Sequence, residues 1–107
     1  MARVNVRPLA EADLADAYAW YETQSSGLGA QFLDEVHAVY EHVEQFPEGF
    51  PDVYRGTRRA LVRRFPYALY YRVLDETAHV IACAHVRRHP RAWRSRVERG
   101  LSNREDG

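Results

Sequence analysis

The chain has 107 residues, which fits one compact domain and leaves little room for two. It is 46% hydrophobic and 12% aromatic, so disorder is not expected, and no apolar run approaches the roughly 20 residues that span a bilayer. The N-terminus shows no basic-then-apolar leader, and the single cysteine, Cys83, has no partner for an internal disulfide. We therefore expect a cytoplasmic protein with a buried, inert thiol.

The formal net charge of zero conceals a strong separation of charge along the chain. Residues 1–53 carry two arginines against ten acidic residues, a balance of −8, whereas residues 54–107 carry thirteen arginines against five, a balance of +8. A GC-rich genome would explain why all 15 basic residues are arginine, but not why they gather in one half. Arginine offers a planar set of donors suited to phosphates and carboxylates, so the basic half predicts an anionic partner, either nucleic acid or an acidic peptide.

The first half of the chain predicts a short strand followed by two helices. Residues 3–7 alternate in polarity and are stopped by Pro8, which predicts a strand. Apolar residues recur at helical spacing over 10–24 and again from Phe32 to Val43, before Phe46-Pro47 ends the pattern. The break at 25–29 contains two glycines. Because this link is short, we expect the two helices to pack as an antiparallel hairpin.

The second half predicts three strands. Residues 47–56 read as a loop, and short segments rich in β-branched, aromatic and aliphatic residues follow at 58–65, 67–74 and 78–87. Residues 75–77 are a candidate hairpin turn, and Pro90 stops the last strand. We expect an α+β fold of order β-α-α-β-β-β, with the helical hairpin packed on an antiparallel sheet. We expect one domain over residues 1–96 and a polar C-terminal tail over residues 97–107. From residue 91 onward the chain is expected to be only partly ordered.

A series of short motifs in a fixed order over residues 4–96 is typical of one family. They are Asp13-Leu14, Trp20-Tyr21-Glu22, Phe32-Leu33, Phe46-Pro47, Arg58-Arg59-Ala60-Leu61, Phe65-Pro66-Tyr67 with Tyr70-Tyr71, His85-Val86-Arg87-Arg88-His89-Pro90, and Trp93 with Arg96. In these motifs, and in the predicted order of elements, the chain resembles the RelE/ParE toxin superfamily. It is closer to the ParE-like, plasmid-stabilisation branch.

The resemblance implies a growth-arresting toxin of a toxin–antitoxin pair, forming a hetero-oligomer with its cognate antitoxin. The antitoxin would contribute an amphipathic, acidic segment that orders as it binds apolar grooves of the hairpin and sheet. ParE-branch toxins poison DNA gyrase, and RelE-branch toxins cleave mRNA in the ribosomal A site. The RelE pattern uses lysines and a tyrosine near the C-terminus. This chain has no lysine and no tyrosine after Tyr71, which favours the ParE branch. The resemblance implies no cofactor.

If the chain cleaved RNA, Arg58, His85 and Arg87 would be its working set. Arginine can stabilise the charge of the transition state and histidine can carry the proton, and alternation along a strand would place His85 and Arg87 on one face. The residues expected to bind the target are Arg59, Arg64, Arg88, His89, Arg91, Trp93, Arg94 and Arg96.

Purely structural explanations of the same residues also stay open. Each arginine alone is also consistent with a solvated or paired charge, and Trp93 with packing back over the sheet. No metal site is expected at His85 and His89, since only a helix would bring both rings to one face. A third reading is an inactive module that binds an antitoxin or nucleic acid.

Overall fold

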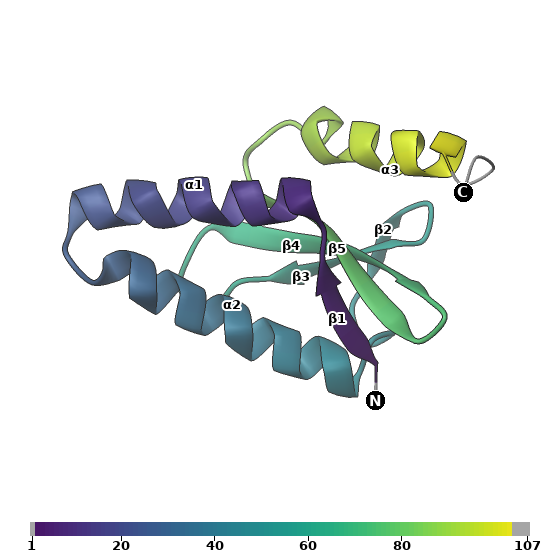
Figure 1. The fold of residues 1–107 in the computed structure, drawn as a ribbon, viewed down its shortest axis with the longest axis horizontal. Coiled ribbons are helices and arrows are strands. Elements are labelled where there is room, and N and C mark those ends of the chain that lie inside the picture. The colour runs from purple at the N-terminus through teal and green to yellow at the C-terminus, as the bar shows by residue number, and fades with distance from the viewer. Residues whose placement is uncertain (1, 104–107) are drawn as a thin grey trace.

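The computed structural model describes residues 2–103, and three helices pack on one five-stranded sheet (Figure 1). The elements in chain order are β1 (Arg3–Val6), α1 (Pro8–Gln24), α2 (Leu28–Gln45), β2 (Asp52–Tyr54), β3 (Thr57–Leu61), β4 (Tyr67–Leu74), β5 (Thr77–His85) and α3 (Arg91–Asn103). The strand order across the sheet is β1-β5-β4-β3-β2. This confirms the predicted α+β class. Within the described residues, no helix is both long and apolar enough to cross a membrane.

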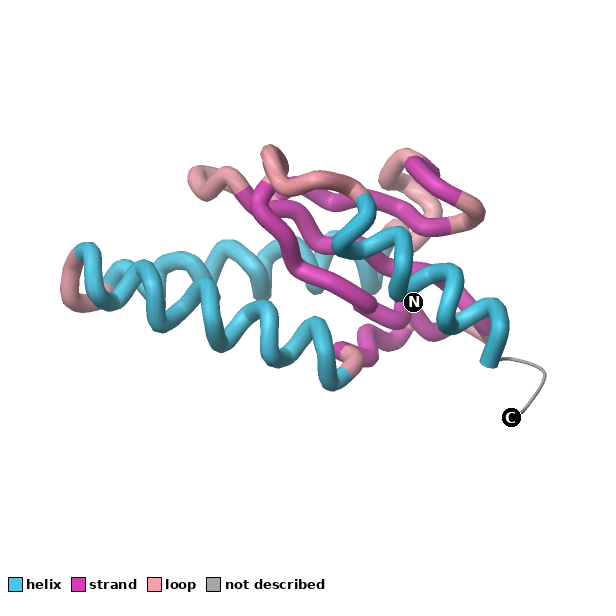
Figure 2. Tube along the Cα trace, turned by 90° about the horizontal axis from the view of Figure 1, so that it is seen from above, coloured by secondary structure: helices cyan, strands magenta, loops and turns pink. Residues whose placement is uncertain are grey.

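The predicted helical hairpin is present, and its closed end projects beyond the sheet (Figure 2). α1 begins two residues before the predicted start, because proline is accepted in the first turn of a helix. The link to α2 turns at Gly27, whose φ is +89°, and the Glu22 carboxylate accepts the backbone N–H groups of Gly27 and Gly29 at 3.2 and 2.7 Å. The two helices therefore leave the turn side by side.

The three late strands pair as antiparallel neighbours, as predicted. The sheet as a whole is mixed, because β1 runs parallel to β5 with Val4 opposite Ala78. Alternation over four residues carries no information about strand direction, so the sequence could not predict this pairing. The predicted loop 47–56 also contains the three-residue strand β2, which pairs with β3. β3 ends at Leu61 rather than at residue 65, because the chain turns through Arg64 at φ 72°.

Two apolar clusters lie on opposite faces of the sheet, since alternate residues of a strand point to opposite sides. Leu69, Tyr71 and Val80 pack with the α1–α2 hairpin on one face. On the other face, α3 packs on the sheet through apolar residues, which are Ala68, Tyr70, Ala82, Ala84, Trp93 and Val97. The core therefore has a large hairpin side and a smaller α3 side.

The expectation of a partly ordered tail from residue 91 is wrong, because Arg91–Asn103 is a helix. Although the segment is rich in arginine, Trp93 and Val97 are four residues apart and form a narrow apolar stripe on one face of the helix. The side chain of Trp93 is 5% exposed and that of Val97 is 1% exposed. Residue 96, the predicted end of the domain, lies inside this helix. The remainder of the predicted tail, residues 104–107, lies outside the described residues.

Candidate functional site

The turn from β5 into α3 presents a dense group of exposed arginines. Four of them, Arg87, Arg88, Arg91 and Arg94, are exposed and follow one another through the turn and the first turn of α3; we call them the arginine surface. Arg94 lies over the Tyr54 ring, 4.7 Å from its centroid, which orients its guanidinium group. The surface thus offers four adjacent cationic groups to an anionic partner.

The two histidines of this segment hold its backbone. His85 Nδ1 accepts the N–H of Arg87 at 3.1 Å, and His89 Nδ1 accepts the N–H of Arg91 at the same distance. The His85 carbonyl also accepts the N–H of Arg88 at 2.9 Å and closes the turn. The two rings therefore hold the backbone at Arg87 and Arg91.

The prediction that His85 and Arg87 share a strand face is wrong. β5 ends at His85, and Arg87 lies in the turn that follows, so strand alternation does not apply to it. The strand stops there because the Arg88 N–H bonds back to His85 instead of continuing a ladder.

Arg58 is engaged elsewhere in the fold. Its Nη1 donates to the carbonyls of Glu48 and Phe50 at 3.1 and 2.5 Å, which secures the segment before β2. Arg58 lies opposite Tyr71 on β4, and His85 lies opposite Tyr67. Four residues along a strand correspond to about 13 Å. The structure therefore does not bring Arg58 and His85 together.

Arg59 and Arg64 lie in different places: Arg59 on β3 near Tyr70 and Trp93, and Arg64 beside the helical hairpin. Arg59 is exposed on β3, opposite Tyr70, on the face that α3 partly covers. Arg64 lies beside the hairpin, where it contacts Glu35 at 3.7 Å and Gln31 at 3.3 Å. The predicted set of target-binding arginines is thus divided between different parts of the surface.

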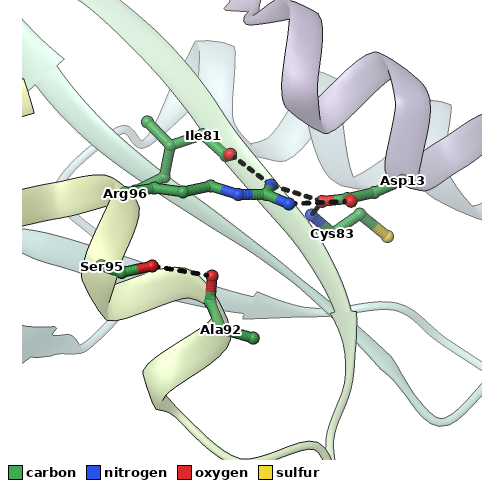
Figure 3. Close-up of polar contacts among 6 residues, drawn as sticks. All are labelled: Asp13, Ile81, Cys83, Ala92, Ser95 and Arg96. Atoms are coloured by element: carbon green, nitrogen blue, oxygen red, sulfur yellow. Dashed lines mark hydrogen bonds and ion pairs between the residues drawn. The ribbon is translucent and has the colours of Figure 1, made fainter. Parts of the chain in front are cut away.

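Trp93 and Arg96 face the protein rather than solvent. The Trp93 ring stacks on Tyr70 with centroids 4.2 Å apart and planes at 17°, which confirms the alternative in which it covers the sheet. Arg96 forms a two-point ion pair with Asp13 of α1, with N···O distances of 2.6 and 3.1 Å (Figure 3). Both side chains attach α3 to the rest of the fold.

Two open grooves lie beside α1. One, of about 570 Å³, lies between α3 and the β1–α1 junction and is lined by Arg7, Arg72 and Arg99. The other, of about 360 Å³, lies between α1 and α2 and is lined by Glu11 and Tyr40. The Tyr40 hydroxyl is buried there without a hydrogen-bond partner among the described residues, and burial raises its pKa.

Sequence reasoning missed the first groove because its residues come from four separate elements. The candidate turn between β4 and β5 was the one feature of the sequence that could have indicated part of this groove. A two-residue turn at Asp75-Glu76, both with positive φ, fixes the hairpin register and places Arg72 opposite His79. The approach of Arg7 and Arg99 to that pair depends on tertiary packing and leaves no pattern in the sequence.

A family model described as "ParE toxin of type II toxin-antitoxin system, parDE" matches residues 4–93. The chain belongs to the ParE toxin family. "Toxin ParE2" of Mycobacterium tuberculosis, in strains CDC 1551 / Oshkosh and H37Rv, is 30% identical over 106 residues, which cover 95% of this chain and 94% of the relative.

A solved structure supports the fold of this ParE-family chain. A chain from the "Chromosomal ParDE TA system from P. aeruginosa" superposes with a TM-score of 0.60 at 21% identity, over 79% of this chain and 96% of that one. The expected family and fold class are thus confirmed, and the protein is the toxin component of a type II toxin–antitoxin system. Membership of a ParDE family implies an antitoxin partner.

Proposed function

We propose that this ParE-family toxin arrests growth by binding DNA gyrase through the arginine surface. The observation that carries the proposal is the continuous exposure of Arg87, Arg88, Arg91 and Arg94, with two histidines holding the turn that presents them. Four cationic groups in one segment suit a target that is acidic or bound to nucleic acid.

The charge on the rest of the molecule favours one orientation on such a target. α1 and α2 carry acidic residues on their exposed sides, among them Asp16, Asp34 and Glu41, and lie on the sheet face opposite α3. An anionic target repels that face and attracts the arginine surface. The toxin would therefore approach with the β5–α3 turn leading.

The ribonuclease alternative has less support. It needs a proton carrier and a charge-stabilising group around one phosphate. Arg58 and His85 are offset by about 13 Å along the strand direction and lie on strands that β4 separates. The Arg58 guanidinium already binds two backbone carbonyls. Arg87 alone remains close to His85, and it interacts with the histidine through its backbone.

The proposal is tested with paired substitutions in purified toxin and in induced cells. Arg87→Gln/Arg88→Gln and Arg91→Gln/Arg94→Gln each remove two charges from the surface. The matched control, Arg3→Gln/Arg63→Gln, removes two exposed charges outside it. We expect both surface variants to lose inhibition of gyrase supercoiling and growth arrest, while the control keeps both.

Three results would overturn the proposal. Full gyrase inhibition by both surface variants would exclude the arginine surface. New transcript ends inside translated codons, with normally supercoiled plasmids, would favour the ribonuclease. Normal growth on induction of soluble wild-type protein would favour an inactive binding module.

A further inference from the structure

The arginine surface continues beyond α3 onto the turn between β2 and β3. Arg94 and Arg55 approach the same ring, since their guanidinium carbons lie 4.7 and 5.2 Å from the centroid of Tyr54. The Tyr54 ring also meets Trp93 of α3 edge to face, with centroids 5.9 Å apart. Arg55 is exposed and has a φ of 48° in the turn that joins the two strands. Tyr54 therefore joins a fifth exposed arginine to the four of the arginine surface.

None of these five arginines forms an ion pair within the described part of the chain. Among residues 2–103, only Arg64 and Arg96 form ion pairs with carboxylates. Residues 77–97 contain no acidic residue. The Glu98 carboxylate accepts a hydrogen bond from the Tyr54 hydroxyl at 2.5 Å, which holds the ring in place. The five guanidinium groups are therefore free to pair with anionic groups of a partner.

The backbone N–H groups of this segment are already used, so recognition depends on side chains. The N–H groups of the four arginines of the arginine surface are bonded inside the protein at 2.9–3.1 Å, to acceptors on His85, His89 and Pro90. Because Nδ1 of each histidine accepts, a neutral ring carries its proton on Nε2. A partner therefore meets planar guanidinium groups on a fixed backbone, and these match the oxygens of a phosphate.

The composition of the surface fits a phosphate backbone better than the face of a folded protein. A stable protein interface has a core of apolar or aromatic anchors inside a polar rim. Of the large hydrophobic residues in segment 85–97, Val86 is exposed, whereas Trp93 and Val97 are buried. Interfaces with nucleic acid are more polar and much more positively charged. Five arginines around one exposed valine are typical of the second kind.

We propose that the arginine surface, extended by Arg55, binds the sugar-phosphate backbone of the double-stranded DNA on which gyrase acts. The guanidinium groups pair with phosphate oxygens, and Tyr54 is a positioning residue that holds Arg55 and Arg94 side by side. Such contacts do not read base sequence, so the toxin binds duplexes of any sequence. The inference rests on the proposed action on gyrase, and it names DNA as the component that the arginines contact.

The first test measures how strongly salt weakens the binding of purified toxin to a short labelled DNA duplex, by fluorescence anisotropy. Five phosphate contacts predict that affinity falls on the order of 500-fold between about 50 and 200 mM salt. Arg87→Gln/Arg88→Gln and Arg91→Gln/Arg94→Gln each remove two contacts and should reduce the fall to roughly 40-fold. Arg55→Gln should reduce it to roughly 150-fold. A salt dependence that none of these changes alters overturns the inference.

The matched control is Arg3→Gln/Arg7→Gln, which removes two exposed charges near β1, at the other edge of the sheet from β2. It should keep the wild-type affinity for DNA and the wild-type salt dependence. A control that weakens binding as much as the surface variants would show that net charge, and not this surface, attracts the duplex. That result would also overturn the inference.

The role of Tyr54 is tested without any change of charge. Tyr54→Leu removes the ring that Arg55 and Arg94 share, and should weaken DNA binding roughly 3-fold with the salt dependence unchanged. Tyr54→Phe loses the hydrogen bond to Glu98 but keeps the ring, and should bind as wild type does. Circular dichroism checks that both variants fold. Equal binding by the two variants would contradict the positioning role.

A second test separates this inference from the proposed function. Wild-type toxin and the two double variants are tested by calorimetry against gyrase alone and against gyrase bound to DNA. We expect the variants to lose affinity for the DNA complex and to match wild type on gyrase alone. Arginine-dependent binding to DNA-free gyrase, with no binding to the duplex, overturns the inference and leaves the proposed function intact. Tighter binding to single-stranded RNA than to the duplex overturns the assignment to DNA, whereas undiminished gyrase inhibition by both variants overturns the proposed function.

Discussion

Arg96 of α3 and Asp13 of α1 lie 83 positions apart in the chain and together complete the open edge of β5 (Figure 3). β1 pairs with β5 only as far as Val80, which leaves backbone groups beyond it without a neighbouring strand. Asp13 accepts the N–H of Cys83 at 2.9 Å, and Arg96 donates to the carbonyl of Ile81 at 2.9 Å. The ion pair therefore substitutes for the missing strand and protects an edge that could otherwise pair with another chain.

Removal of the Asp13 carboxylate is predicted to destabilise the fold. Asp13→Ala leaves the Arg96 guanidinium, whose side chain is 17% exposed, without its partner and the Cys83 N–H without its acceptor. We expect a loss of about 2–4 kcal/mol in the free energy of unfolding, measured by urea denaturation. Asp16→Ala, at an exposed position on the same helix, should change it by less than about 0.5 kcal/mol. Equal effects at both positions would contradict this role.

Alanine is predicted to have opposite effects at two helical glycines. A Cβ at Gly29 of α2 would lie 2.8 Å from the backbone oxygen of Tyr18 of α1, whereas a Cβ at Gly100 would meet nothing within 4 Å. Gly29→Ala should cost about 1–3 kcal/mol, because backbone must shift. Gly100→Ala should stabilise α3 by up to about 1 kcal/mol, since alanine favours helix. Thermal melting of both variants tests this, and stabilisation by Gly29→Ala would disprove the close approach.

Truncation of Trp93 is predicted to release α3. The ring is 5% exposed and stacked on Tyr70, so Trp93→Ala should cost about 3–5 kcal/mol of local stability. Hydrogen exchange should show faster exchange at the amides of α3 than at those of α1 and α2. Trp20→Ala removes the same ring where it is 55% exposed, and should cost about 1 kcal/mol or less. Uniform acceleration across the whole chain would show instead that α3 does not unfold separately.

Cys83 is predicted to resist alkylation in the folded protein. Burial, and secondarily the Asp13 carboxylate, raises the pKa of its thiol from 9.0 to about 12. At pH 9.0 the folded thiol stays protonated while the unfolded one is half ionised. Iodoacetamide should therefore label Cys83 slowly in buffer and rapidly in concentrated urea. A native labelling rate close to that of a free thiol would contradict the buried position.

The raised pKa of the Cys83 thiol makes the free energy of unfolding fall at alkaline pH. Above pH 9.0 the unfolded state loses the thiol proton first, so the unfolded state binds fewer protons than the folded state. The contribution of Cys83 to stability is therefore complete below pH 9.0 and is lost as the pH rises towards about 12. Cys83→Ala should remove this part of the alkaline destabilisation in urea titrations at several pH values.

The sequence by itself determined the elements that depend on local pattern. Helical spacing and a two-glycine link predicted the α1–α2 hairpin, and the candidate turn at residues 75–77 predicted the pairing of β4 with β5, although Thr77 already belongs to β5. These features were predictable because each depends on residues close together in the chain. The order of motifs along the chain was also sufficient to indicate the family that the comparison confirmed.

Only the tertiary structure decided which arginines are exposed and which are paired with residues far away in the chain. The sequence showed Arg91, Arg94 and Arg96 as one cluster, but α3 exposes the first two and turns Arg96 towards Asp13. It gave no direction for β1 and no sign of the groove that joins Arg7 to Arg99. These outcomes depend on which surfaces meet when separate elements pack, and that free energy comes from contacts between residues far apart in the chain.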